Sequence, residues 1–256
     1  DMAAASAPSI GHCNTMGTAS SMNSIAEALG MSLPGGAIIP APYKERTDIS
    51  FKTGKRIVEM VFENLTPLKI MTKEAFENAV YVASAIGASS NCPPHLTAIA
   101  RHMGIDFNLD QWEKLGHRIP LLANCQPAGE HLMEGFFKAG GIPAIMKELI
   151  KDKKLNIKAL TVTGKTIEEN LNMKIDVNRD VIKSYENPLS HNAGFIVMKS
   201  NFFSSAVMKT SVISSEFRER YLSNKDSLNI FEVKAVVFEG PEDYHKRIND
   251  DSLKID

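Results

Sequence analysis

The sequence predicts an α/β protein in which a helix-rich first part is followed by a β-rich second part. In the first part, apolar residues recur at spacings of three, four and seven, which is typical of amphipathic helices. After Pro188, short apolar runs rich in β-branched and aromatic residues alternate with turn residues, as strands do. These runs are Phe195–Met198, Ala206–Ile213 and Phe231–Phe238. We therefore predict two domains, 1–175 and 188–256, joined at about 175–190.

Composition bounds the class of protein. The 256 residues are 43% apolar, and 29 basic and 30 acidic side chains give a net charge of −1. Such a chain can bury a sizeable core, and its charge gives no reason to expect nucleic acid as a partner. No apolar run reaches the roughly 18 residues that span a bilayer. Three cysteines without paired spacing favour a reducing compartment, the cytoplasm or, in a eukaryote, the mitochondrion.

The first predicted helix directly follows a cysteine-containing loop, GHCNTMG. Met22, Ile25 and Leu29 form its apolar face, and Gly30 is its predicted stop. Thr18 stands where an N-cap is expected, with a hydroxyl able to accept from a free backbone N–H. Cys13 then precedes a helix N-terminus, whose dipole favours a thiolate. A thiolate is the ligand that a soft metal or an iron–sulfur cluster requires.

Two further helices are predicted from apolar stripes. Phe51, Val58 and Phe62 share one face of the first, which ends before Pro67. Thr72 is the predicted cap of the next, and its buried side includes Phe76.

The loop IGASSNCPPH precedes a helix that opens at Pro93 and Pro94, because proline suits the first helical turn. Asp110 is the predicted cap of a short helix that contains Trp112 and stops at Gly116.

A short apolar run then predicts a buried strand over 119–123, leading into a functional loop. Helices are expected at Leu132–Lys138 and Pro143–Ile150, on either side of a double glycine. Leu160–Val162 indicates a strand or turn. The capping-box pattern at Thr166-Ile-Glu-Glu169 starts one more helix.

The segments GHCNTMGTAS, AEALGMSLPG and IPAPY together resemble the dehydratase family that contains dihydroxy-acid dehydratase, 6-phosphogluconate dehydratase and the sugar-acid dehydratases. They look most like the sugar-acid (arabinonate, xylonate) branch. PAGEHLMEGFFKAGGIPAIMKEL continues the likeness, and NPLSHNAGFIVMKSNFFSSAVMKTSVIS resembles the start of the family's second domain. The resemblance implies a three-layer α/β N-terminal domain followed by the start of a β-barrel-like domain.

The resemblance also implies a reaction. Family members remove water from a 2,3-dihydroxy acid and give a 2-oxo-3-deoxy acid. An iron–sulfur cluster, 2Fe-2S rather than 4Fe-4S, acts as the Lewis acid, and Mg²⁺ binds the carboxylate end of the substrate. Cys13 matches one of the three cluster cysteines. The implied partners are a small hydroxy-acid substrate and further copies of the chain, as a homodimer or homotetramer, with no nucleic acid and no membrane.

The family's Cys-Asp-Lys motif, its Mg²⁺-binding acids and the glycine-rich segment with its basic serine are not found in this sequence. We therefore expect an internal piece of such an enzyme, inactive alone, and assign no catalytic residue within it.

Several other residues can be interpreted either as functional or as structural. Cys92 lies three residues before His95, a spacing seen in metal pairs, but no second pair completes a zinc set, so Cys92 is interpreted as a non-ligand residue lining the site. Cys125 is interpreted as core or loop. Asn91 and His95 lie in a loop of the kind that carries function, and a histidine satisfied inside the fold is the equal alternative. Lys209, in a strand-like run, is expected either at an edge or near the site.

Three functions stay open at this point. The leading one is a hydro-lyase acting on a sugar acid (aldonate). The first alternative is the dihydroxy-acid dehydratase of branched-chain amino-acid biosynthesis. The second, from a different class, is a non-catalytic remnant or a subunit that supports an oligomer.

Overall fold

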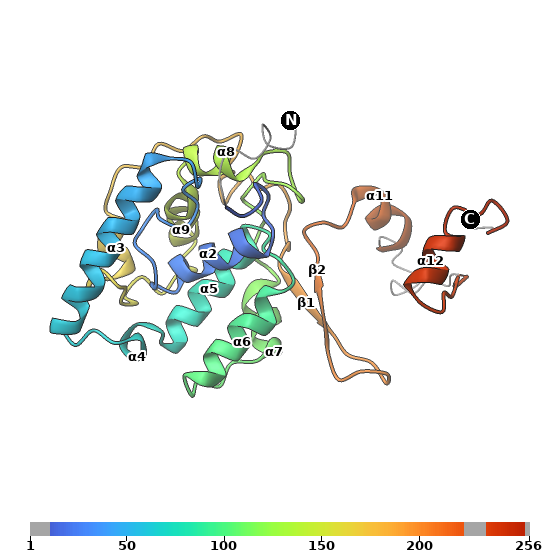
Figure 1. The fold of residues 1–256 in the computed structure, drawn as a ribbon, viewed down its shortest axis with the longest axis horizontal. Helices are drawn as coiled ribbons and strands as arrows, with labels where there is room; N and C mark the ends of the chain where they lie inside the picture. The colour runs from blue at the N-terminus through green and yellow to red at the C-terminus, as the bar shows by residue number, and fades with distance from the viewer. Residues whose placement is uncertain (1–10, 223–233, 254–256) are drawn as a thin grey trace. The chain divides into compact units, whose positions relative to one another are not determined.

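The computed structural model describes residues 11–222 and 234–253, and its contacts divide the chain into two compact units, Asp1–Val212 and Ile213–Asp256. The first unit is mainly helical, with one small antiparallel sheet (Figure 1), so the structure is a mixed α/β one. Its helices are α2 (Thr18–Ala28), α3 (Lys44–Phe62), α4 (Pro67–Ile70), α5 (Lys73–Ala85), α6 (Cys92–His102), α7 (Leu109–Gly116), α8 (Met133–Lys138), α9 (Gly141–Lys151) and α10 (Ile167–Asn170).

Helix α5 lies at the centre of the first unit and packs against α2, α6, α7 and α9. It begins directly after Thr72, as predicted, and Phe76 on its inner face is fully buried. Most of its residues are small or β-branched, which lets neighbouring helices approach closely. The resulting core joins segments from residue 16 to residue 207 of the chain.

The sheet consists of β1 (Phe195–Met198) and β2 (Ala206–Lys209), paired antiparallel with Phe195 opposite Lys209. Phe195 anchors it to α7, because its ring meets that of Trp112 edge to face at 5.4 Å. The Thr210 hydroxyl donates to the Gly194 carbonyl at 2.6 Å and closes the open end of the pair.

The predicted strands are confirmed only in part. Phe195–Met198 forms as expected, but the second strand stops at Lys209 because a turn follows at residues 211–212. The run at 119–123 is buried but is no strand: its backbone bonds the end of α5 and the loops at 181–190, with single bridges at Leu121 and Ala123. Of Phe231–Phe238, residues 231–233 lie outside the described part, and 234–238 are irregular.

Side-chain contacts correct one predicted helix cap. Asn108, not Asp110, caps α7: its side chain accepts from the N–H of Gln111, and the Gln111 side chain accepts from the N–H of Asn108. Helix α3 forms as predicted, and its apolar stripe is exposed. Phe51 is 76% and Phe62 86% exposed, and Met60 is the buried residue of this helix.

The second unit contains α11 (Ser215–Phe217), a turn of π-helix (Arg218–Leu222) and α12 (Pro241–Arg247). In α12, Arg247 donates to Asp243 one turn earlier at 2.8 Å. Across the described residues of both units, no helix is long and apolar enough to cross a membrane.

Candidate functional site

The loop before α2 presents Cys13 to solvent. Its sulfur lies 3.5 Å from the hydroxyl of Thr15 and 3.5 Å from the place where a Cβ on Gly17 would stand. The hydrogen bonds from Thr15, first from its hydroxyl and then from its backbone N–H, hold the pKa of the Cys13 thiol below its usual value. Cys13 therefore has the exposure and the thiolate character of a metal ligand.

Backbone contacts from distant segments hold this loop in shape. The N–H of Met16 donates to the carbonyl of Gln126 at 2.8 Å, and the N–H of Met133 donates to the carbonyl of Asn14 at 3.0 Å. The side-chain oxygen of Asn14 accepts from the N–H of Glu134 at 3.0 Å. Met16 itself is buried, so the loop is fixed on the side opposite the exposed sulfur.

Thr18 is not the N-cap of α2, contrary to the prediction. Gly17 occupies that position, and Thr18 is the first helical residue. Its hydroxyl instead bonds the hydroxyl of Ser89 and accepts from the amide of Asn91, both at 2.9 Å. The hydroxyl of Ser21, one turn along, accepts from the N–H of Ser89 at 2.9 Å. The first turn of α2 is thus joined to the loop that starts α6.

This contact brings two helix N-termini together, those of α2 and α6. Asn91 is the N-cap of α6, which opens at Cys92 with two prolines following, as predicted. Helix N-termini carry partial positive charge, so two of them side by side favour a thiolate or an anionic ligand.

Two of the predicted lining residues lie at this junction. Asn91 is exposed there, and Lys209 of β2, half-buried, is close enough to Cys92 to interact with its thiol. Burial lowers the pKa of Lys209, and no ion pair to it is found in the described part of the chain. His95 lies one turn along α6 from Asn91 with an exposed side chain, so the structure does not join it to this cluster.

The other two cysteines are buried. Burial raises the pKa of Cys92 to about 11 and that of Cys125 to about 12. Cys125 lies in the core, as the sequence indicated, and its carbonyl accepts from the N–H of Gly129. Neither thiol has the exposure or the pKa of a ligand, and no group of three His, Cys, Asp or Glu residues that could hold a metal occurs among residues 11–222 and 234–253.

A buried carboxyl group near the C-terminal end of α2 was missed by the sequence analysis. Glu27 is 5% exposed, and its two oxygens accept the N–H groups of Gly35 at 2.7 Å and Ala37 at 2.9 Å. Burial raises its pKa to about 7, although both hydrogen bonds act in the other direction. On the helix Glu27 shares its side with Ser20 and Ser24 and lies away from Ile25, so the apolar pattern of the sequence gave no signal for its burial.

Two cavities of about 510 and 540 Å³ lie elsewhere, one beneath α3 and one between α6 and β2. Neither is lined by Cys13, Asn91 or Lys209. The candidate site is therefore an open surface around Cys13 and the paired helix N-termini, not one of these two cavities.

Comparison with models of known protein families identifies the family of this chain. The model described as dihydroxy-acid/6-phosphogluconate dehydratase N-terminal matches residues 1–170, and the corresponding C-terminal model matches residues 180–256. The chain belongs to the dihydroxy-acid/6-phosphogluconate dehydratase family. The resemblance seen in the sequence is confirmed, and it covers nearly the whole chain.

Individual members of the dehydratase family are similar over the same span. The chain is 53% identical over 256 residues to a D-xylonate dehydratase of Caulobacter vibrioides, covering all of this chain and 43% of that protein. It is 44% identical over 249 residues to an L-arabinonate dehydratase of Rhizobium leguminosarum, covering 97% of this chain and 41% of that one. A dihydroxy-acid dehydratase of Acetivibrio thermocellus is 39% identical over 249 residues, covering 97% of this chain and 44% of that protein. The chain thus spans less than half the length of these relatives.

Proposed function

We propose that the enzyme containing this chain is a hydro-lyase that converts a sugar acid to its 2-oxo-3-deoxy acid. The observation that carries the proposal is the GHCNTMG loop, with its exposed Cys13, in a chain 53% identical to a D-xylonate dehydratase. The similarity to an L-arabinonate dehydratase supports the same substrate class. Dihydroxy-acid dehydratase is the alternative within the family, since one such enzyme is 39% identical.

The chemistry requires two groups acting on adjacent carbons. A base removes the C2 proton, and hydroxide leaves from C3, where negative charge develops on the departing oxygen. An iron–sulfur cluster, when bound, supplies a Lewis acid for that oxygen. We propose that it is of the 2Fe-2S type and that Mg²⁺ binds the substrate carboxylate.

Cys13 is the residue of this chain that fits the cluster. Its thiol is exposed and its pKa is lowered, whereas the sequence's other two cysteines are buried with raised pKa values. We infer that Cys13 contributes one ligand and that the remaining thiolates come from outside these 256 residues. The proposed lining residues are Asn91, which bonds Thr18 in the first turn of α2, and Lys209, which interacts with Cys92; His95 is retained as a third candidate on α6, the helix that Asn91 caps.

The finer architecture is also a proposal. We infer a three-layer α/β N-terminal domain over 1–175 and the start of a β-barrel-like domain over 188–256. The ranges of the two family models, which leave 171–179 unmatched, are consistent with a boundary there. A cytoplasmic enzyme, homodimeric or homotetrameric and acting on a small hydroxy acid, completes the proposal.

Two measurements on the full-length enzyme test this function. Keto-acid formation is followed with D-xylonate, L-arabinonate and 2,3-dihydroxy-isovalerate, and the two sugar acids are expected to react faster. A clear preference for the branched dihydroxy acid would select the alternative instead.

The second measurement is the iron content and visible absorbance of Cys13→Ser, which are expected to be lost together with activity. Cys125→Ala is the matched control, since its thiol is buried and its pKa is raised, and it is expected to keep its iron. Normal cluster occupancy in Cys13→Ser would contradict the ligand assignment.

A further inference from the structure

The residue that follows Cys13 connects the cysteine loop to helix α8. Like every helix, α8 has free N–H groups at its N-terminus, and its N-cap residue, Leu132, supplies no side-chain acceptor for them. Asn14 supplies two acceptors instead. Its backbone carbonyl accepts the N–H of Met133 at 3.0 Å, and its side-chain oxygen accepts the N–H of Glu134 at 3.0 Å. Asn14 therefore caps a helix that lies 120 positions further along the chain.

Helix α8 is a firm point of attachment. Met133 and Phe136 are buried in the core of the first unit. At the surface, the carboxylate of Glu134 accepts the hydroxyl of Tyr43 at 2.5 Å and the ammonium of Lys138 at 2.7 Å. A residue that is bonded to the first turn of α8 is thus fixed relative to the core.

Three segments that carry the family resemblance meet at this cap. Asn14 lies in GHCNTMG, Tyr43 ends IPAPY, and Glu134 lies in PAGEHLMEGFFKAGG. The first two segments also touch, because a Cβ on Gly11 would stand 2.9 Å from that of Ala41. The function proposed above uses only the cysteine of these segments, so their junction has no role in it.

Packing does not account for the side chain of Asn14. It is exposed and fills no space in the core, and its one hydrogen bond within the described part of the chain is the bond to Glu134. The two bonds of Asn14 fix both its peptide group and its side chain, and the Cα of Cys13 is only about 3.8 Å away along the chain. The place of the sulfur is therefore set from α8.

We propose that Asn14 is a positioning residue, which holds Cys13 in place as a ligand of the cluster by capping α8. The inference rests on the proposed function, because it requires Cys13 to be a ligand. Groups that hold a metal ligand in its orientation typically contribute about 10–100-fold to metal affinity or activity. Asn14 acts in this way through the chain itself, since it is joined covalently to the ligand residue and by hydrogen bonds to a fixed helix.

Iron release from the full-length holoenzyme tests the role of Asn14. Each protein is mixed anaerobically with an excess of the chelator bathophenanthroline disulfonate, and the decay of the visible absorbance gives the rate. Asn14→Ala removes the side-chain acceptor and is expected to release iron at least about tenfold faster than the wild type, with an altered visible circular dichroism spectrum. Asn14→Asp retains an acceptor oxygen and is expected to keep the wild-type rate. A wild-type rate in Asn14→Ala, or a fast rate in Asn14→Asp, would overturn the proposal.

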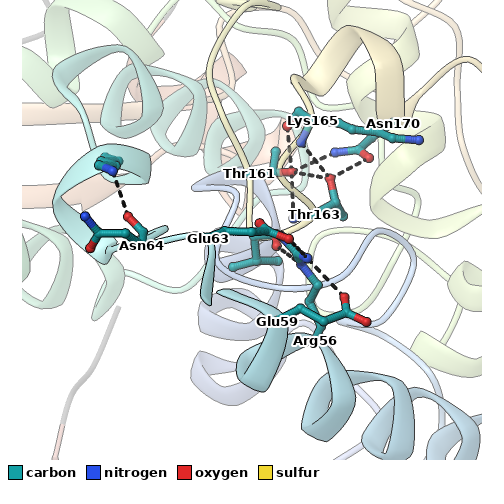
Figure 2. A network of polar contacts seen from close by, with 10 residues as sticks. Arg56, Glu59, Glu63, Asn64, Thr161, Thr163, Lys165 and Asn170 are labelled. Carbon is teal, nitrogen blue, oxygen red and sulfur yellow. Dashed lines mark hydrogen bonds and ion pairs between the residues drawn. The ribbon is translucent and has the colours of Figure 1, made fainter. Parts of the chain in front are cut away.

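Two other asparagines control for a general loss of stability. Asn108 caps α7, and Figure 2 shows Asn170 joined to Thr161 and Thr163 by hydrogen bonds of 2.8 and 2.9 Å. Asn108→Ala and Asn170→Ala are expected to lower the melting temperature and to release iron at the wild-type rate, because neither side chain bonds the cysteine loop in the described structure. Fast release from either variant would show that any destabilisation loosens the cluster, and would overturn the proposal.

A change on the helix side keeps the test decisive if Asn14→Ala does not fold. Glu134→Pro removes the N–H that Asn14 accepts, and proline is tolerated in the first turn of a helix; Pro93 occupies the same second position of α6. Glu134→Ala loses the same side chain but retains the N–H. Iron release is expected to be faster from Glu134→Pro than from Glu134→Ala, and equal rates would overturn the proposal.

Cys13→Ser separates this inference from the proposed function. If that variant keeps its cluster, Cys13 is not a ligand, and both proposals are wrong. If it loses its cluster while Asn14→Ala releases iron at the wild-type rate, the ligand assignment stands and only the role of Asn14 is wrong.

Discussion

At the scale of single residues, the three cysteines show how position decides chemistry. Cys13 is exposed beside the Thr15 hydroxyl, which stabilises its thiolate, while burial away from water disfavours the charged form of Cys92 and Cys125. The same side chain is therefore an exposed, reactive thiol at one position and a packing residue at two others.

Thiol reactivity should separate the three directly. In the native protein without cluster, we expect iodoacetamide to modify Cys13 well before Cys92 or Cys125, because the thiolate is the reacting species and must be accessible. Peptide mass spectrometry over time gives the order. In Cys13→Ser the fast phase should vanish, whereas rapid native labelling of Cys92 would contradict the buried position found here.

Glu27 should make stability depend on pH. Its native pKa of about 7 lies above the ordinary 4.5, so between these values the native state holds a proton that the unfolded chain has released. Linkage then requires stability to fall as pH rises through this window, by on the order of 2–3 kcal/mol at most. Urea unfolding at about pH 5 and about pH 8 should show this fall in the wild type and a smaller one in Glu27→Gln. An equal fall in unfolding free energy between the two pH values in the wild type and in Glu27→Gln would contradict this role of Glu27.

At the scale of elements, close backbone contacts set how helices and strands meet. Gly30 ends α2 with φ +80°, and its carbonyl accepts from the N–H of Val162 at 2.7 Å. Gly194, just before β1, lies against the end of α7: a Cβ there would stand 2.0 Å from the carbonyl oxygen of Gly116. Both glycines are places where two chain segments touch with no room for a side chain.

Gly194→Ala should therefore be strongly destabilising. The atoms in the way belong to the backbone of Gly116 and His117, so α7 and β1 must move apart, at a cost of about 3 kcal/mol. Denaturant unfolding measures the loss. Gly135→Ala, in α8 with its nearest neighbour atom at an ordinary 3.8 Å, is the control and should be neutral or stabilising. A loss below about 1 kcal/mol in Gly194→Ala would mean that the contact relaxes freely.

At the scale of the whole molecule, one core joins the ends of the first unit. Trp112 of α7 is fully buried and meets Phe195 of β1, 83 positions later in the chain, edge to face. Three polar side chains are buried in the same unit, and each makes a hydrogen bond to a backbone carbonyl: Ser20, Ser24 and Asn78. Helices and hairpin are therefore expected to unfold together.

The single tryptophan gives a test of this cooperativity. During urea unfolding of the 256-residue chain, the fluorescence of Trp112 and the far-UV circular dichroism should change in one coincident transition. Phe195→Leu should move both signals to lower urea by the same amount. A fluorescence change that precedes the loss of helix would show that the hairpin detaches by itself.

Some local sequence signals were confirmed and others were not. The capping box of Thr166 and Glu169 forms with both of its hydrogen bonds, and the prolines after Cys92 open α6. Asp110 failed as a cap because Asn108, two residues earlier, offers its side chain to the same free N–H groups together with Gln111. When two neighbouring polar side chains can cap the same helix, the side-chain geometry decides which of them does, and the spacing of residues in the sequence does not show that geometry.

The amino-acid sequence by itself determined the longer helices of the first unit, the Cys13 loop and the family, because periodicity, capping residues and an ordered series of motifs are properties of neighbouring residues. Only the tertiary structure decided that the α3 stripe is exposed, that Thr18 bonds Ser89 and Asn91, and that Glu27 of α2 is buried against the loop at 35–37. Burial and hydrogen-bond partners depend on which distant segments arrive at a surface. An apolar stripe requires a partner, and the sequence pattern alone does not name one.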